Sequence, residues 1–329
     1  MTKPLLAALE MQELSRPPVW IMRQAGRYLP EYRQLRERHS FQEAVSTPKI
    51  AAELTLQPVR RFGVDGAVIF ADIMTPLQAM GVEIDFDPGP KLKPLSPEEV
   101  VGLPDLDPDR VAHVSQTIEM VRDQLPAETA VIGFAGAPVT LLAYLLEGGG
   151  SKDFMAMRAA LRARPSLVEE ALAKLASSMN AYLAVQVASG AEVVQLFDTW
   201  AGLLDRSGYE RWALPAARQS LAGIAAPTIY FAPGAGHTLE LQRKIGATGY
   251  GVDWRVPIGE ALATFDGLPV QGNLDPAVLL SDPATIAREV KALLEEVGGW
   301  PGHIMNLGHG IDRRTPPENV AALVGAVRS

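Results

Sequence analysis

Two arginines lie four residues apart just after an apolar segment near the start of the chain. Arg23 and Arg27 follow the segment Val19–Met22. The guanidinium group is planar and permanently charged, and it binds a carboxylate through two parallel N–H groups. A helical turn would place both side chains on one side of the chain. Because the net charge of the protein is −8, these basic groups indicate a local pocket for an anionic molecule.

Further polar side chains follow other apolar segments. If these segments are parallel strands of one barrel, the residues beyond their carboxyl ends surround a common mouth, where barrel enzymes carry their catalytic groups. In chain order these residues are Arg23, Gln24, Arg27, Asp72, Tyr144, Asp198, Thr199, His237, Asp253, Asn273, Asp275 and His309. Guanidinium, carboxylate, phenol, hydroxyl and imidazole groups around one cavity predict a site for a polycarboxylate. His237 is given no role.

Eight short apolar segments supply the strands that would position these groups. Each is four or five residues long, continuous rather than alternating, and rich in Val, Ile and Phe, which is typical of strands buried on both faces of a parallel sheet. They are Val19–Met22, Ala67–Phe70, Ala130–Phe134, Val193–Phe197, Thr228–Phe231, Thr248–Val252, Leu268–Gln271 and His303–Leu307.

Helical patterns separate many of these segments. In Pro108–Leu125 and Pro165–Ala188 the apolar residues recur three or four apart, and prolines stand where several helices would begin. Eight strands alternating with helices predict an α/β fold, either a barrel or a doubly wound sheet. The strand count of eight, and the absence of a Gly-x-Gly-x-x-Gly motif after the first strand, favour a (β/α)8 TIM barrel. We expect a single domain over residues 1–329, with a surface excursion at Asp85–Asp107.

Composition excludes several classes of protein. The chain has no cysteine, so disulfides, thiolate nucleophiles and Cys-ligated zinc are excluded. The N-terminal apolar run is too short for a secretory leader, and no segment approaches the roughly 20 apolar residues of a membrane span. The acidic balance argues against affinity for nucleic acid. We therefore expect a soluble, cytoplasmic protein with neither a membrane nor a nucleic acid as partner.

Seven segments resemble the uroporphyrinogen decarboxylase family, in the same order and with similar spacing over essentially the whole chain. The first, VWIMRQAGRYLPEYR at 19–33, contains an eleven-residue string, RQAGRYLPEYR, that is highly specific. The others are FADIMTPLQAMG (70–81), GFAGAPVTLLAYLLEGGGSKDF (133–154), QLFDTWAG (195–202), GVDWR (251–255), QGNLDP (271–276), and NLGHGI with TPPENV between 306 and 320.

This resemblance implies a TIM barrel, usually a homodimer, that converts uroporphyrinogen III to coproporphyrinogen III by removing four acetate carboxylates. It implies no organic cofactor and no metal. Asp72 and Arg23 would be catalytic, and Arg36 matches a further arginine of the family. The substrate-binding residues would be Arg23, Gln24, Ala25, Gly26, Arg27, Asp72, Tyr144, Thr199 and His309. The sequence departs from the family pattern at Ala71, at Thr199, which keeps a hydroxyl, and at Asp312–Arg314, which is more charged than usual.

The substrate that the resemblance implies can act as its own electron acceptor. Protonation of a pyrrole carbon next to the acetate-bearing carbon gives a cationic ring, which takes up the electron pair as CO2 leaves. A carboxylate at the centre of the macrocycle, for which Asp72 is the candidate, would stabilise this cation and accept pyrrole N–H groups. Arg23, a bound water and His309 stay open as proton donors.

Each of these residues also has a structural interpretation. Asp72 could cap the helix that begins near Thr75, and Arg23 and Arg27 could pair with Glu31 or another carboxylate. Tyr144 could be a packed core residue, Thr199 could be an N-cap, and His309 could be satisfied by the barrel wall. The glycines on either side of His309 favour a close approach to a ligand.

Two other functions stay open. One is a corrinoid-linked methyltransferase on the same fold, whose zinc site would be hard to build without cysteine. The other is a non-catalytic tetrapyrrole-binding protein, against which the sequence argues only by retaining Asp72 and both arginines.

Overall fold

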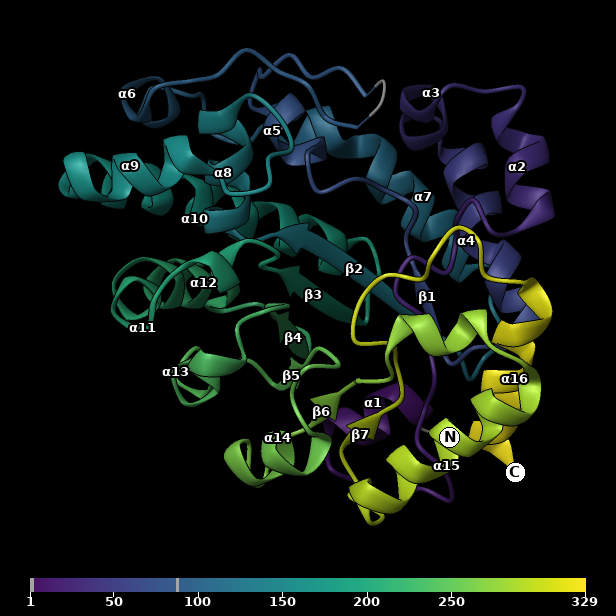
Figure 1. Cartoon of the computed structure of the whole chain (residues 1–329). Coiled ribbons are helices and arrows are strands. Elements are labelled where there is room, and N and C mark those ends of the chain that lie inside the picture. Colours follow the sequence, from purple (N-terminus) through teal and green to yellow (C-terminus); the bar gives the residue numbers. More distant parts are fainter. Residues whose placement is uncertain (1–2, 87–88) are drawn as a thin grey trace.

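A parallel β-sheet forms the centre of the molecule (Figure 1). The computed structural model describes residues 3–86 and 89–329. Within them the sheet has seven strands in chain order, and each pairs in parallel with the next. The strands are β1 (Gly66–Val68), β2 (Ala130–Gly136), β3 (Val193–Phe197), β4 (Thr228–Phe231), β5 (Gly249–Gly251), β6 (Val270–Gln271) and β7 (His303–Ile304). The predicted bounds of the third and fourth of these strands are confirmed.

The expectation of an eighth regular strand at Val19–Met22 is wrong in the described residues. Val19 forms a single parallel bridge with Met305, beyond β7, while its carbonyl oxygen accepts a hydrogen bond of 2.7 Å from the Asp65 N–H, beside β1. This segment therefore lies between the two edges of the sheet and closes an α/β barrel of the TIM type.

The segment forms no regular ladder because side chains accept three of its four backbone N–H groups. Pro18 has no N–H to donate. The N–H of Val19 donates to Asp65 Oδ2 at 2.7 Å, that of Ile21 to Gln24 Oε1 at 3.0 Å, and that of Met22 to Asn306 Oδ1 at 3.0 Å. These acceptors come from distant parts of the sequence, apart from Gln24.

Helices surround the sheet and connect its strands (Figure 1). The α-helices are α1 (Pro4–Leu9), α2 (Pro30–Arg36), α3 (Phe41–Ser46), α4 (Pro48–Phe62), α5 (Thr75–Ala79), α6 (Pro97–Val101), α7 (Ala112–Arg122), α8 (Pro138–Glu147), α9 (Met155–Ala163), α10 (Pro165–Ala188), α11 (Arg206–Gly208), α12 (Leu214–Leu221), α13 (Leu239–Arg243), α14 (Ile258–Thr264), α15 (Pro283–Val297) and α16 (Pro317–Arg328). Prolines at the first turn of several of them, as predicted, occupy positions whose N–H would have no helical partner. Residues 87 and 88 of the predicted surface excursion lie outside the described residues, and α6 lies within the rest.

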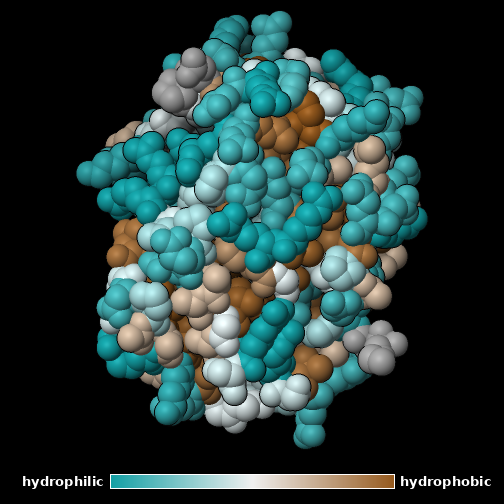
Figure 2. Space-filling view, turned by 90° about the vertical axis from the view of Figure 1, so that its right-hand side faces the viewer, coloured by the Kyte–Doolittle hydropathy of each residue, from teal (hydrophilic) through white to brown (hydrophobic). Residues whose placement is uncertain are grey.

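The outer helices bury one face each. In α15, Ile286, Val290 and Val297 lie four and seven residues apart and are buried, and most of its charged residues face outward. Figure 2 shows the side of the molecule that faces right in Figure 1, where hydrophilic side chains cover most of the surface and hydrophobic ones appear in separate patches. None of the helices that the structure describes combines the length and the apolar run needed to cross a membrane.

A small apolar cluster fills the barrel interior, and helix α1 closes the end of the barrel where the strands begin. Leu5, Ala8 and Leu9 of this helix pack in one buried cluster with residues that begin strands, including Ala130 and Val193. Strands begin at the amino-terminal end of a parallel barrel, so α1 blocks that end. Any open cavity within the barrel must then face the carboxyl ends of the strands.

Candidate active site

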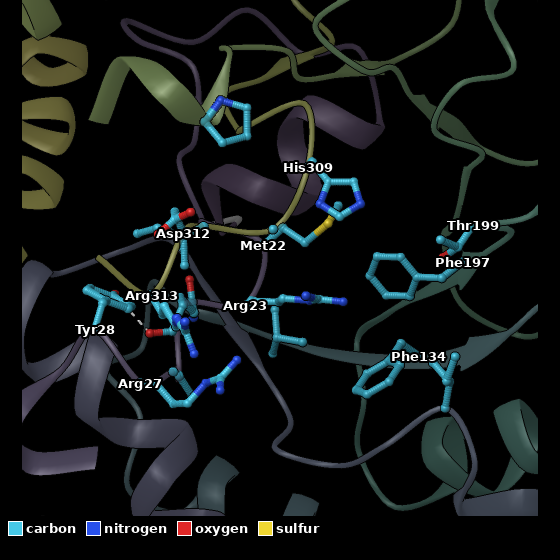
Figure 3. Close-up of a pocket in the computed structure, with 18 of the residues that line it drawn as sticks. Met22, Arg23, Arg27, Tyr28, Phe134, Phe197, Thr199, His309, Asp312 and Arg313 are labelled. Atoms are coloured by element: carbon cyan, nitrogen blue, oxygen red, sulfur yellow. Dashed lines mark hydrogen bonds between the residues drawn. The ribbon is translucent and has the colours of Figure 1, made fainter. Parts of the chain in front are cut away.

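A cavity of about 820 Å³ opens at the carboxyl ends of the strands. Its lining comes from segments far apart in the sequence: the turn after the Val19 bridge, the loops that follow β1, β3, β6 and β7, and helix α8. Figure 3 shows several of these side chains, with Arg23 reaching into the space between two groups of residues. The predicted mouth of the barrel is therefore a real concavity.

The structure brings the predicted substrate-binding residues to this one cavity. It is lined by Arg23, Gln24, Ala25, Gly26, Arg27, Asp72, Tyr144, Thr199 and His309. Asp275, from the list of strand-end residues, lines it as well. These residues can act on one substrate only if they share a cavity, and they do. Their role in substrate binding stays a prediction.

Four other strand-end residues do not face the mouth, so that part of the prediction is wrong. Asp198, His237, Asp253 and Asn273 are absent from the lining and bond within the barrel wall instead. His237 Nε2 lies 2.8 Å from the Leu204 carbonyl oxygen, and Asn273 Nδ2 donates to the carbonyl oxygens of Asp253 and Val256. Side chains of successive extended residues point to opposite faces, so Asp198 faces away from the cavity that Phe197, the last residue of β3, lines.

Arg36 also lies outside the cavity lining. Its Nη1 donates to the carbonyl oxygen of His39 at 2.5 Å, and its guanidinium carbon lies 5.6 Å from the centre of the Phe41 ring. Phe41 itself lines the cavity. Arg36 therefore contacts a residue of the cavity wall and does not face the cavity itself.

Arg23 is held in a backbone conformation that is unusual for a residue with a side chain. A turn closed by the Gln24 N–H donating to the Ile21 carbonyl oxygen, at 2.9 Å, places Arg23 at φ +63°. This left-handed region costs an L-residue roughly 1 kcal/mol or more, and glycine is the usual occupant. Strain of this kind concentrates at functional sites because the side chain is needed there.

Gln24 fixes this turn and is not free to bind a ligand through its side chain. Its Oε1 accepts the Ile21 N–H, and its Nε2 donates to the carbonyl oxygen of Gly66 at 2.9 Å. The side chain is buried. Gln24 thus ties the turn that carries Arg23 to strand β1.

The two predicted arginines are exposed to the cavity without a counter-ion. Within residues 3–86 and 89–329, neither Arg23 nor Arg27 forms an ion pair, and Glu31 is bound instead by Arg61 at 3.1 Å. The alternative that Arg27 pairs with Glu31 is therefore not realised. In a protein with a net charge of −8, two unpaired guanidinium groups in one cavity form a local anion-binding surface.

Asp72 holds the turn before helix α5 and faces the cavity. Its Oδ1 accepts the Met74 N–H at 2.9 Å in that turn, but Met74 is the residue at the cap position and α5 has no side-chain cap, so the capping interpretation is wrong. Its Oδ2 has no hydrogen-bond partner among the described residues, and the side chain lines the cavity. Burial raises the pKa of Asp72, although the Met74 N–H and the Arg23 charge oppose this. A poorly solvated carboxylate with one open oxygen is suited to accept N–H groups from a ligand.

His309 and Tyr144 both line this cavity. Burial, with the charges of Arg23 and Arg255, lowers the pKa of His309 below its ordinary value, so the imidazole is neutral near pH 7. The edge of its ring meets Trp254 at a centroid distance of 6.3 Å. Tyr144 packs edge-on against Phe154 and Trp200, and burial raises its pKa. The packed-tyrosine interpretation is thus correct for the ring, which also lines the cavity.

Three phenylalanines form an aromatic floor that the sequence analysis did not identify. Phe134, Phe197 and Phe231 come from the adjacent strands β2, β3 and β4 and line the cavity. Their rings meet edge to face, with centroids 5.7 Å apart for the first pair and 6.2 Å for the second. Each is the last residue of a predicted apolar segment, and that shared position was a signal that could have found them.

A family model described as uroporphyrinogen decarboxylase matches residues 1–329. The chain belongs to the uroporphyrinogen decarboxylase family. A relative with that name from Geobacter sp. (strain M21) is 42% identical over 317 residues, which cover 94% of this chain and 93% of the relative. The uroporphyrinogen decarboxylase of Syntrophotalea carbinolica is 43% identical over 321 residues, which cover 95% of this chain and 94% of the relative.

Solved structures share the fold of this uroporphyrinogen decarboxylase family member at lower identity. A methyltransferase from Methanosarcina mazei has a TM-score of 0.83 and is 21% identical, covering 99% of this chain and 97% of that chain. A B12-independent methionine synthase from a Shewanella species has a TM-score of 0.57 at 13% identity, covering 85% and 87%. These likenesses show the barrel fold, whereas the sequence relationship is to decarboxylases. The methyltransferase alternative is therefore not favoured.

The His, Asp and Glu side chains of the described residues are the potential ligands of a metal ion. Across residues 3–86 and 89–329, no group of three or more His, Cys, Asp or Glu side chains could hold a metal ion. For this member of the uroporphyrinogen decarboxylase family, the expectation of no metal and no cofactor stays a prediction.

Asp198, next to Thr199, anchors a buried polar chain behind the cavity wall. Its Oδ1 accepts the Thr140 hydroxyl and its Oδ2 accepts the Tyr230 hydroxyl, both at 2.9 Å, and the Tyr209 hydroxyl lies 2.9 Å from that of Tyr230. Burial raises the pKa of Asp198 to about 6, against the two hydroxyl hydrogen bonds. The network joins helix α8, which carries Tyr144, to strands β3 and β4.

We predict that Asp198→Asn removes part of the pH dependence of folding stability. Because the pKa is raised from 3.8 to about 6, the folded state binds a proton that the unfolded state has released, and stability falls as pH rises through this window. This difference corresponds to about 3 kcal/mol. The free energy of unfolding of Asp198→Asn, relative to the parent protein, should therefore increase by about this amount between pH 4 and pH 7. Denaturant titrations check this, with exposed Asp266→Asn as control; an unchanged difference across the window would contradict it.

Proposed function

We propose that this chain removes the acetate carboxyl groups of uroporphyrinogen III as CO2 and leaves four methyl groups, giving coproporphyrinogen III. The observation that carries the proposal is one cavity that combines unpaired guanidinium groups, from Arg23 and Arg27, with the open oxygen of Asp72. A molecule with carboxylates at its rim and N–H donors at its centre complements this arrangement. Membership of the decarboxylase family supports the same reaction.

Asp72 would act on the pyrrole nitrogens. The four N–H groups of a porphyrinogen can converge on one side, and an ionised carboxylate oxygen accepts several of them. When a ring carbon is protonated, the positive charge spreads to the pyrrole nitrogen, close to Asp72. A carboxylate fixed by the Met74 N–H is already oriented and stabilises this charge without rearrangement.

The decarboxylation itself then balances within the substrate. The bond between the acetate methylene and its carboxyl carbon breaks, and CO2 leaves without the bonding electrons. The cationic ring accepts that electron pair, and a second proton, delivered to the methylene carbon, completes the methyl group. The ring carbon then releases the first proton, which restores the pyrrole, so that one proton is consumed for each CO2. Arg23 and Arg27 would hold the acid arms, each charge-assisted contact being worth roughly 1.5–3 kcal/mol.

The aromatic floor would hold the flat faces of the pyrroles and exclude water. Phe134, Phe197 and Phe231 offer apolar rings to the cavity, and Figure 3 shows the first two of them across from Arg27. His309, neutral near pH 7, would serve as a hydrogen-bond partner, while Arg23 and a bound water stay open as proton donors. We expect a cytoplasmic homodimer of single-domain chains that needs no cofactor, as the family resemblance implies.

The product mass tests this function. The protein is incubated with uroporphyrinogen III under reducing conditions, and the carboxyl groups of the oxidised products are counted by mass spectrometry. Loss of four CO2 supports the proposal, and a heat-denatured sample is the control. Tight binding without any loss of mass would instead establish the non-catalytic tetrapyrrole-binding protein.

The glycines on either side of His309 closely approach other parts of the protein. A Cβ at Gly310 would collide with Arg23 Cδ and lie 3.0 Å from both Cγ and Nε of that side chain. A Cβ at Gly308 would collide with the backbone nitrogen of Trp254 and lie 2.9 Å from the Asp253 carbonyl carbon. Gly310 therefore gives room to a movable arginine, and Gly308 to a fixed backbone.

We predict that Gly310→Ala lowers kcat/KM for uroporphyrinogen by about 10-fold or more with little change in stability. The methyl group displaces the Arg23 side chain, and a misplacement of about 1 Å can cost up to about 100-fold in rate. Steady-state kinetics and thermal unfolding measure the two effects. Gly308→Ala is the matched control, because its clash is with backbone and should chiefly destabilise the fold. A Gly310→Ala protein with parental kinetics would mean that the position of Arg23 is unimportant.

A further inference from the structure

The loop after β7 carries a third arginine to the cavity. Asp312, Arg313 and Arg314 line its rim, together with His309. The loop is anchored at both ends of this stretch, because the Ile311 N–H donates to the Met22 carbonyl oxygen at 3.0 Å and the Thr315 N–H donates to the Asp312 carbonyl oxygen at 3.1 Å. These side chains are therefore presented by a fixed turn.

Two of the three charges at this turn neutralise each other. Arg314 Nε and Nη2 donate to the two oxygens of Asp312, both at 2.9 Å, and the Arg314 N–H adds a third bond at 2.8 Å. These contacts hold the pKa of Asp312 at about 2, so it stays ionised and paired. The net positive charge of the turn is left with Arg313.

Arg313 has no partner of its own. It is exposed, and in the part of the chain that the structure describes it forms no ion pair or hydrogen bond. Figure 3 shows Arg313, Arg27 and Arg23 on one side of the cavity, across from Phe134, Phe197 and Thr199. Three guanidinium groups from two distant segments thus face the same space, and none of them forms an ion pair with a described residue.

We infer that Arg313 binds a carboxylate arm of the substrate that is not being removed, and so favours highly carboxylated tetrapyrroles. This inference rests on the proposed function. Arg23 lies close enough to Asp72 for its charge to lower the pKa of that carboxyl, so the reacting ring belongs near this pair. Arg313 is exposed at the rim and would meet an arm of another ring.

Steady-state kinetics with uroporphyrinogen III test the inference. Arg313→Ala should raise KM by about 5- to 10-fold and leave kcat within about 2-fold. This increase in KM lies between the loss expected for an exposed ion pair and that expected for a well-formed charge-assisted hydrogen bond. Arg313→Lys should give an intermediate KM, because it keeps the charge and loses the planar fork. Arg288→Ala, on the exposed face of α15 and outside the cavity, changes the net charge equally and should leave KM unchanged.

A binding experiment separates this inference from the proposed function. Uroporphyrin, the oxidised and unreactive form, reports affinity by its fluorescence whether or not turnover occurs. Weaker binding by Arg313→Ala than by Arg288→Ala supports the inference even if no CO2 is released, in which case only the proposed function fails. Equal KM and equal uroporphyrin affinity in these two variants would overturn the inference, as would a fall in kcat at unchanged KM.

Discussion

Asp72→Asn is expected to lower kcat for uroporphyrinogen by about 1,000-fold while the protein folds as before. Asparagine keeps an oxygen that can accept the Met74 N–H, so the turn before α5 survives. It removes the negative charge that would stabilise the cationic pyrrole, and loss of one oriented group of this kind typically costs about 100- to 1,000-fold. Stopped or steady-state assays of CO2 release, with thermal unfolding alongside, measure both effects.

The controls for Asp72 separate its two roles. Asp72→Ala removes both the charge and the hydrogen bond to the Met74 N–H, so it should lose activity and also about 1 kcal/mol of stability. In the parent protein, activity should fall as pH decreases through the raised pKa of Asp72, because only the ionised form accepts the pyrrole N–H groups. The residual activity of Asp72→Asn should lack that acidic limb. Turnover by Asp72→Asn close to that of the parent would remove Asp72 from the mechanism.

The parallel strands could be predicted from the sequence because burial on both faces leaves a direct pattern. Continuous apolar runs gave the bounds of β3 and β4. Val19–Met22 has the same pattern but forms only a bridge. Its backbone donors bond to Asp65 and Asn306, contacts that no local pattern contains.

The cavity could be predicted in part. The position beyond each strand end correctly indicated Asp72, Thr199 and His309, but the pattern of segments did not say which of two successive residues faces inward. Asp198 was therefore placed in the mouth, although alternation turns it into the wall, where Thr140 and Tyr230 bind it. The phenylalanines were missed for the opposite reason, since an apolar residue at a strand end was read as core.

Arg23 offers a test in which activity and stability should move independently. Its φ of +63° is a conformation that glycine adopts freely and that an L-residue occupies at a cost. The guanidinium group makes no ion pair within the described residues that would offset this cost. The strain is understandable if the side chain is retained for a ligand, and the lowering of the Asp72 pKa by Arg23 places its charge beside the proposed catalytic carboxylate.

Arg23→Gly is therefore expected to lower kcat/KM for uroporphyrinogen by about 100-fold and to leave the free energy of unfolding equal to the parental value or slightly higher. The loss follows from one charge-assisted contact of roughly 1.5–3 kcal/mol, and the stability follows from relief of the left-handed strain, offset by the greater freedom of glycine in the unfolded chain. Steady-state kinetics and denaturant titration measure the pair of effects.

Arg23→Ala keeps the strain without the guanidinium group, so it should match the kinetic loss without the gain in stability. If Arg23→Gly instead destabilised the fold by several kcal/mol, the strained turn would be a structural requirement, and the assignment of Arg23 to the substrate would lose its physical basis.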